Sequence, residues 1–132
     1  MKFEHFALNV PDAAAMAAWY VEHVHMQIVR AIQGAPHTHF LADATGRVVM
    51  EIYTNPAAPI PDYANQDPLC LHVAFAVEDA AAERDALIAS GATLVVNQTL
   101  DDGDAKTRTL LVMLRDPWGI ALQLCQRSVP MG

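Results

Sequence analysis

The sequence has few cysteines and few cations, and each shortage excludes a class of protein. It contains two cysteines, Cys70 and Cys125, in 132 residues. Two cysteines do not make a disulfide framework, so both are expected as free thiols in a reducing compartment. Eight Lys and Arg stand against fifteen Asp and Glu, for a net charge of −7. Because nucleic-acid binding needs clustered cations that neutralise phosphates, nucleic acid is not an expected partner.

Long hydrophobic runs are also missing. No stretch approaches the ~20 apolar residues that a membrane-spanning helix needs, and the first residues, Met1 to Phe6, do not resemble a signal peptide. The length of 132 residues and the apolar fraction of 53% are those of one globular domain. We therefore expect a single domain over residues 1–132, located in the cytoplasm and without membrane contact.

An internal repeat organises the chain. The segment HFALNVPDAAA at residues 5–15 aligns with HVAFAVEDAAA at residues 72–82. Alanines could match by chance in an Ala-rich sequence, but histidine, valine and aspartate also match in step. We interpret the pattern as a duplication.

Each copy begins with a strand pattern that leads into a helix. Apolar residues alternate after His5 and again around His72, as in a half-buried strand. Asp12 and Asp79 then stand where a helix N-cap is expected. The following helices have apolar residues at three- and four-residue spacing: Met16, Trp19 and Tyr20 in the first, Leu87 and Ile88 in the second.

Three further strands are predicted after each helix. They cover about 27–33, 38–42 and 47–54 in the first copy, and about 93–99, 106–115 and 119–126 in the second, where Asp102-Gly103 is a good hairpin turn. Residues 56–69 contain four prolines and form the linker. The predicted fold is therefore α+β, with two βαβββ modules at about 1–55 and 70–127. Together they make a curved, mixed, mostly antiparallel sheet with the helices on the outer face.

Four polar residues lie at matching places of the two modules. His5 and His72 begin the first strands, and Glu51 and Gln123 interrupt the last apolar strands. Because large apolar neighbours such as Met50 want the helix-covered face, alternation turns all four away from the helices. Their same-face neighbours are mostly small, so this face predicts a cup for a ligand.

The four side chains are a plausible donor set for one divalent ion. Two imidazoles and a carboxylate suit Zn²⁺, Ni²⁺, Mn²⁺ or Fe²⁺, and the Gln123 amide oxygen or waters would complete the coordination. A single strand histidine is more often structural or exposed, but the repeat brings all four to one face. We predict His5, Glu51, His72 and Gln123 as metal ligands.

These motifs resemble the vicinal oxygen chelate superfamily, which includes glyoxalase I, methylmalonyl-CoA epimerase, extradiol dioxygenases and bleomycin-resistance proteins. The resemblance covers nearly the whole chain and extends to Trp19-Tyr20, to VVMEIYTN around Glu51 and to the turn Asp116-Pro117-Trp118-Gly119. It implies one metal ion per site and a homodimer, often with sites shared between subunits. Bacterial glyoxalase I has His, Glu, His and Glu at the four positions, so Gln123 here replaces the last carboxylate.

The resemblance implies an enzyme, and we expect a metal-dependent lyase or isomerase of glyoxalase type. The ion would bind vicinal oxygens of a small substrate, and Glu51 would be the catalytic residue as ligand and base. The predicted substrate-binding residues are Asn9, Tyr53, Asn55 and Arg115. Two alternatives remain open: a small-molecule binding or antibiotic-resistance protein without catalysis, and an Fe²⁺-dependent dioxygenase.

Overall fold

The chain forms two compact units, Met1–Pro61 and Asp62–Gly132. The computed structural model describes residues 1–100 and 108–131, so the hairpin turn predicted at Asp102-Gly103 lies outside the described residues. The boundary between the units falls within the predicted linker. No helix in the described ranges is long and apolar enough to cross a membrane.

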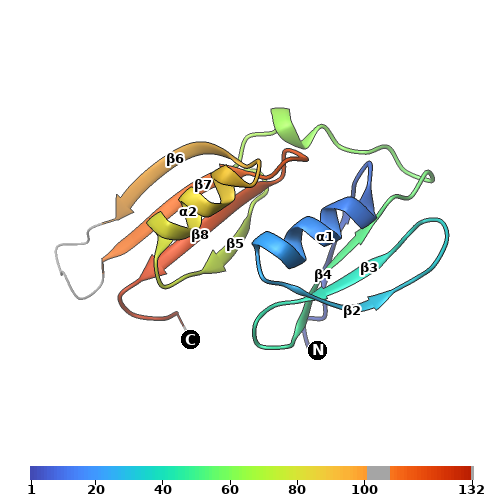
Figure 1. The fold of residues 1–132 in the computed structure, drawn as a ribbon, viewed down its shortest axis with the longest axis horizontal. Coiled ribbons are helices and arrows are strands. Elements are labelled where there is room, and N and C mark those ends of the chain that lie inside the picture. Colours follow the sequence, from blue (N-terminus) through green and yellow to red (C-terminus); the bar gives the residue numbers. More distant parts are fainter. Residues whose placement is uncertain (101–107, 132) are drawn as a thin grey trace. The chain divides into compact units, whose positions relative to one another are not determined.

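The first unit contains β1 (Phe6–Asn9), α1 (Ala13–His23), β2 (Gln27–Ala31), β3 (His39–Ala42) and β4 (Val48–Tyr53). Its sheet has the strand order β1-β4-β3-β2. β1 and β4 run parallel, whereas β3 is antiparallel to both of its neighbours. The helix lies against one face of this sheet (Figure 1).

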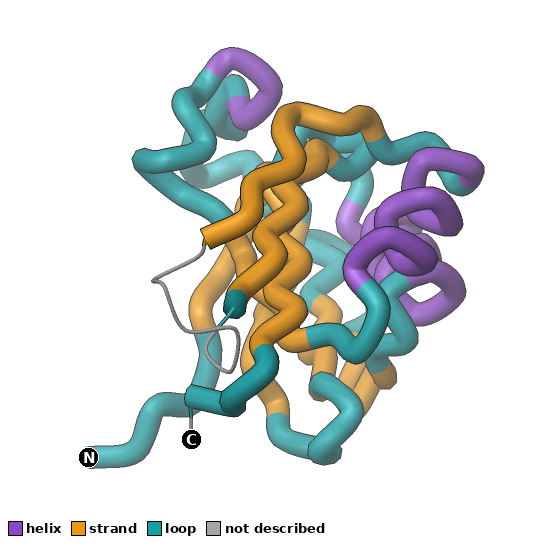
Figure 2. Tube along the Cα trace, turned by 90° about the vertical axis from the view of Figure 1, so that its left-hand side faces the viewer, coloured by secondary structure: helices purple, strands orange, loops and turns teal. Residues whose placement is uncertain are grey.

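The second unit repeats this arrangement after a short 3-10 helix, η1 (Tyr63–Asn65). It contains β5 (Val73–Ala76), α2 (Ala80–Ala89), β6 (Thr93–Leu100), β7 (Thr109–Arg115) and β8 (Ala121–Arg127). The strand order β5-β8-β7-β6 is equivalent to that of the first unit. In the side view, in which this unit faces the viewer, its helix lies on one side of its strands (Figure 2). The predicted α+β fold with two βαβββ modules is confirmed.

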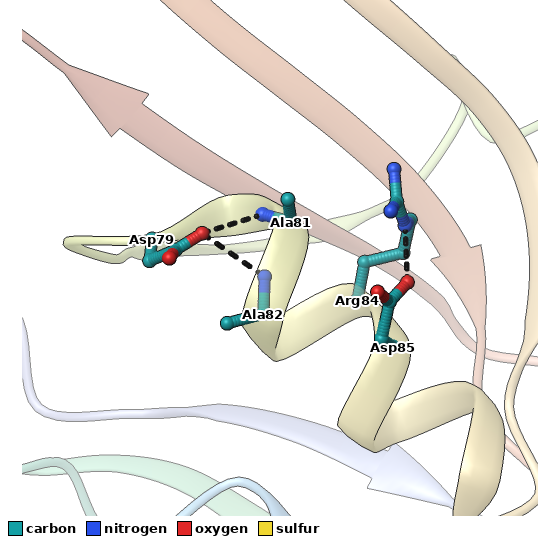
Figure 3. Close-up of polar contacts among 5 residues, drawn as sticks. All are labelled: Asp79, Ala81, Ala82, Arg84 and Asp85. Carbon is teal, nitrogen blue, oxygen red and sulfur yellow. Dashed lines mark hydrogen bonds and ion pairs between the residues drawn. The ribbon is translucent and has the colours of Figure 1, made fainter.

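Both helices begin at the predicted aspartate caps. Asp12 Oδ1 accepts a hydrogen bond from the Ala15 amide at 3.0 Å. Asp79 Oδ1 accepts from the amides of Ala81 and Ala82 at 3.1 and 3.0 Å (Figure 3). These carboxylates satisfy N–H groups of the first turn that have no partner within the helix.

The helix faces agree with the predicted pattern except at one position. Met16, Trp19 and Tyr20 of α1 are buried, as is Leu87 of α2. Ile88 is 41% exposed, so its predicted place on the packed face is wrong. Successive helix residues point about 100° apart. In this short, alanine-rich helix, Leu87 therefore faces the sheet and Ile88 turns away from it.

Strand pairing confirms the duplication at the level of single residues. In the parallel pair β1 and β4, Ala7 lies opposite Glu51. In the parallel pair β5 and β8, the matching Ala74 lies opposite Gln123. The neighbours of Glu51 and Gln123 along the strand form the core: Met50, Ile52, Leu122 and Leu124 are at most 3% exposed. Glu51 and Gln123 thus occupy equivalent places on the face opposite the core, as the alternation predicts.

Candidate functional site

The first unit brings two of the predicted metal ligands together. His5, directly before β1, places Nε2 at 3.1 Å from Oε2 of Glu51 on the neighbouring strand β4. The two side chains are 26% and 19% exposed. Two ligand atoms on one ion, each bonded at about 2.0–2.2 Å, lie roughly 3 Å apart. The His5 and Glu51 side chains therefore have the spacing of two adjacent ligands.

An aromatic ring and a second carboxylate lie next to the His5 imidazole. It packs edge-on against Phe40 with the ring centroids 5.6 Å apart, and Phe40 is the strand partner of Glu51 on β3. The second ring nitrogen, Nδ1, is buried and makes no hydrogen bond. Glu4 Oε2 lies 2.9 Å from it, but outside hydrogen-bond geometry. Metal-binding histidines usually donate from this second nitrogen to an acceptor such as a carboxylate; Glu4 is near enough to be that acceptor, but the bond is not formed in this structure.

The second unit fixes the tautomer of the other predicted imidazole. His72 Nδ1 lies 2.8 Å from the carbonyl oxygen of Pro68. Since a carbonyl only accepts, Nδ1 must carry the proton, and Nε2 of the neutral ring keeps a free lone pair. That lone pair is what a metal ion requires. In its neutral form the ring would therefore coordinate a metal ion through Nε2.

Gln123 completes the second pair of predicted ligands. Its half-buried side chain stands on β8 opposite Ala74, as Glu51 stands opposite Ala7 on β4. The amide oxygen of Gln123 accepts a hydrogen bond from Cys125 Sγ at 3.4 Å. The Cys125 thiol is buried, and this burial raises its pKa, although the neighbouring Arg127 has the opposite effect.

Each unit therefore provides half of the predicted ligand set. Within the described part of either unit, no three His, Cys, Asp or Glu side chains cluster as a metal site would. His5 and Glu51 meet in the first unit, and His72 and Gln123 occupy the equivalent places in the second. The four-residue site stays a prediction, because its two halves belong to different units.

Asn9 and Asn55, two predicted substrate-binding residues, bind each other. Asn9 Oδ1 accepts from the Asn55 amide at 2.8 Å, and Asn9 Nδ2 donates to the carbonyl oxygens of Asn55 and Ala58 at 3.0 and 3.2 Å. Tyr53, half-buried, pairs with Asn9 across the strands. These bonds fix the chain where it leaves β4. A substrate role for Asn9, Asn55 and Tyr53 stays a prediction.

Arg115 holds the segment that leads into the second unit. Its Nη1 donates to the carbonyl oxygens of Tyr63 and Gly119 at 2.9 and 3.0 Å, and its Nη2 donates to that of Gln66 at 2.6 Å. The predicted substrate role of Arg115 is likewise untested. The observed contacts tie η1 to the turn before β8.

A hollow of about 870 Å³ opens in the second unit. It is lined by β5 and the two residues after it, by the beginning of β7, the end of β8 and the C-terminal tail. Arg108 and Arg127 both line it. The sequence interpretation missed them, although β8 carries a readable signal: Gln123, Cys125 and Arg127 follow at two-residue spacing and so share one face.

Comparison by sequence matches the chain to one family. The family model described as Glyoxalase/Bleomycin resistance protein/Dioxygenase superfamily matches residues 2–124. None of the curated proteins matches the chain significantly.

Solved structures with the same fold include proteins of different roles. An antibiotic binding protein from Streptomyces sp., TnmS3, is 18% identical with a TM-score of 0.65, covering 96% of each chain. A glyoxalase/bleomycin resistance protein from Albidiferax ferrireducens is 21% identical with a TM-score of 0.66, covering 95% of this chain and 98% of that one. A mutant of glyoxalase I from Zea mays is 20% identical with a TM-score of 0.72, covering 96% of this chain and 44% of the maize chain.

Proposed function

The chain belongs to the glyoxalase/bleomycin resistance protein/dioxygenase superfamily, and on this basis we propose that it is a metal-dependent lyase or isomerase of glyoxalase type. Its substrate would be a small molecule with vicinal oxygens, and its ligands would be His5, Glu51, His72 and Gln123. The ion would be Zn²⁺, Ni²⁺, Mn²⁺ or Fe²⁺. We also propose a cytoplasmic homodimer, in which each site is completed within one chain or between two.

One observation supports the proposal above the others. His5 Nε2 and Glu51 Oε2 stand 3.1 Å apart, and the strand register puts His72 and Gln123 at the equivalent backbone places of the second unit. A structural ion pair alone would not need metal-binding residue types at the equivalent places. A cation with ligands from both copies would need it, because each copy supplies only two donors.

Each residue has a role in proton transfer beside a carbonyl. When bound, the divalent ion would polarise the substrate oxygens and make the adjacent C–H more acidic. Glu51 is the only acid among the four positions, so it would take that proton and return it to the neighbouring carbon. His5 and His72 would stay neutral donors, and the Gln123 amide would add a ligand without adding charge.

The test measures metal content and turnover together. Protein as purified is analysed for bound metal, then loaded with Zn²⁺, Ni²⁺, Mn²⁺, Fe²⁺ or Co²⁺ and assayed with hemithioacetals and epimerisable thioesters. We expect turnover with at least one ion and a loss of about a hundredfold or more in Glu51→Gln, the magnitude typical of a missing general base. Glu22→Gln, on the exposed surface of α1, is the matched control. No turnover with any ion would reject the proposal.

A binding protein without catalysis is the second candidate. It is favoured by the hollow of about 870 Å³ in the second unit, a volume suited to a drug-sized ligand, and by the likeness to an antibiotic binding protein. Such a protein would hold no metal as purified and would lose no stability on chelation. Oxygen uptake with catechols by the Fe²⁺-loaded protein would instead indicate a dioxygenase.

A further inference from the structure

We propose that the hollow of the second unit binds a small amphiphilic organic anion, a carboxylate or a phosphate monoester, whose charged end lies between Arg108 and Arg127. The proposal rests on the proposed function only where it makes this anion the substrate. The binding itself depends on residues of the second unit alone.

The lining of the hollow combines an apolar body with a charged end. Phe75, Val77, Leu110 and Met131 contribute apolar surface, and Ala74 and Ala76 leave space. Two further polar lining residues are already used: Gln126 Oε1 accepts from the Ala80 amide, and Ser128 bonds to the Arg108 carbonyl oxygen. A ligand with an apolar part and one charged group matches this division.

The chain has few cations, yet two of them line this hollow. Of its eight Lys and Arg, Arg84 is paired with Asp85 and Arg115 is bonded to carbonyl oxygens. Arg108 and Arg127 line the hollow, and neither has a carboxylate within ion-pair distance among the residues that the structure describes. Arg127 Nη1 donates one hydrogen bond, to Thr109 Oγ1 at 3.4 Å, and its other N–H groups can still donate to an anion. With no carboxylate beside them in a protein of net charge −7, the two guanidinium groups suit an external anion.

The backbone brings the two arginines to the same end of the β7 and β8 pair, where both line the hollow. Arg127 lies opposite Thr109 in the antiparallel pair of β7 and β8, so Arg108 is one residue from its direct partner. The Ser128 amide also donates to the Arg108 carbonyl oxygen at 3.1 Å. An anion held at this end of the hollow would accept from both guanidinium groups.

Comparison of the two units explains why the hollow opens in the second. In the first unit, Asn9 lies opposite Tyr53, and Asn9 is bonded to the chain after β4. At the equivalent place in the second unit, Ala76 lies opposite Cys125, and both line the hollow. The second unit therefore has two smaller side chains at the places of Asn9 and Tyr53, and these lie beside Gln123. The hollow thus borders a predicted metal ligand.

One carboxylate, Glu78, also lines the hollow and offers an internal control. It is exposed and forms no ion pair with Arg108 or Arg127 among the described contacts. Glu78 lowers the positive potential that an anion would meet. The substitution Glu78→Gln should therefore tighten anion binding, whereas loss of either arginine should weaken it.

The test uses full-length protein freed of metal by chelation, so that its result is independent of the metal site. Calorimetry measures the binding of octanoate, octyl phosphate and neutral octanamide to the parent protein and to Arg108→Gln, Arg127→Gln and Glu78→Gln. Arg30→Gln, an exposed arginine on β2 of the other unit, is the matched control. Thermal unfolding of each variant verifies that it is folded.

We expect at least one of the two anions to bind about tenfold or more tightly than octanamide, the difference expected for a charge-assisted hydrogen bond. Each arginine variant should lose about tenfold, Glu78→Gln should bind more tightly, and Arg30→Gln should be unchanged. The anion that binds more tightly identifies carboxylate or phosphate as the preferred group.

Equal binding of octanamide, unchanged binding in both arginine variants, or no binding of either anion would overturn the proposal. Metal-free protein that binds the anion but shows no turnover after loading would reject only the proposed function.

Discussion

Arg115 illustrates how one side chain fixes the path of the chain. Its guanidinium donates three hydrogen bonds to backbone carbonyls, two of them in the segment 63–66. That segment leads to Pro68, whose carbonyl oxygen accepts from His72 Nδ1. Gly119, at a φ of +89°, lies so close to this segment that a Cβ would be 2.6 Å from the Ala64 amide nitrogen. Arg115 and the turn before β8 therefore fix the backbone segment that leads to His72, a predicted metal ligand.

Arg115→Met should destabilise the fold by about 2 kcal/mol, because it leaves carbonyl acceptors of a charged donor without a partner. Arg115→Lys should recover only part of this loss, since an ammonium lacks the planar fork that reaches several carbonyls at once. Urea unfolding of the parent and both variants measures the difference. If Arg115→Met keeps its full stability while the KM of a substrate rises, the structural role is wrong and the predicted substrate role is supported.

The two thiols should differ sharply in reactivity. Cys70 is exposed and Cys125 is 6% exposed, and burial raises the pKa of the Cys125 thiol. Since the thiolate is the reactive form, Cys125 should react with Ellman's reagent at least about tenfold more slowly than Cys70 near pH 8. The protonated thiol favours the folded state below the ordinary thiol pKa of about 8.5, and this contribution disappears as the pH rises through the raised value.

Measurement on Cys70→Ser and Cys125→Ser separates the two reactions. In Cys70→Ser, the labelling rate of Cys125 should rise steeply above the ordinary thiol pKa. Equal rates for both single-cysteine proteins at pH 8 would contradict the assigned burial of Cys125.

Side-chain roles were harder to predict than the positions of the residues. Alternation was sufficient to place Glu51 and Gln123 opposite the core, because Met50, Ile52, Leu122 and Leu124 must be buried. Asn9 and Arg115, by contrast, bind backbone carbonyls. Every residue has a carbonyl, so no side-chain pattern in the sequence announces these acceptors. Arg127 was missed because the predicted strand ended at residue 126, one residue before the observed end of β8.

At the scale of elements, the two aspartate caps make comparable helix starts. Asp79 accepts from two amides of α2 (Figure 3), whereas Asp12 accepts from one amide of α1. Asp79→Ala should cost about 1 kcal/mol, the usual value of an N-cap. Urea unfolding gives the free energy of the change. Asp85→Asn, on the exposed surface of the same helix, should shift the midpoint much less, because Asp85 is 68% exposed and water weakens its ion pair with Arg84. An equal shift in both variants would contradict the capping role.

The elements themselves were predictable because the first strand of each module alternates and each helix begins at an aspartate cap. Strand ends were less accurate: β2 ends at Ala31 and not near Gln33, and β3 begins at His39 and not at Thr38. The turn between these strands contains Gly34 and His37 with positive φ, a conformation that ends the regular strand pattern. All residues of β2 and β6 are exposed, so burial does not define their ends. Two-sided exposure leaves the limits of such edge strands weakly specified.

At the scale of the molecule, the duplication gave two units with equivalent topology and unequal surfaces. The first unit has an acid and large polar side chains, and the second has an amide, small residues and a hollow. A metal site with two donors from each copy would therefore be electrostatically uneven, with its only carboxylate on one side. The sequence predicted the repeat but not this division, which depends on strand register.

The final prediction concerns the coupling of the two units through one ion. A ligand that binds only the folded state stabilises it by about 2.7 kcal/mol at a hundred times its dissociation constant. Metal addition should therefore raise the Tm of the parent protein, and chelation should reverse the increase.

Both His5→Ala and His72→Ala should lose this increase, although the two residues belong to different units. His23→Ala, at the end of α1, should keep it. An ion bound by one unit alone would depend on only one of the two histidines. Differential scanning fluorimetry of the four proteins, with and without metal, thus decides between a site built by both copies and a site confined to one.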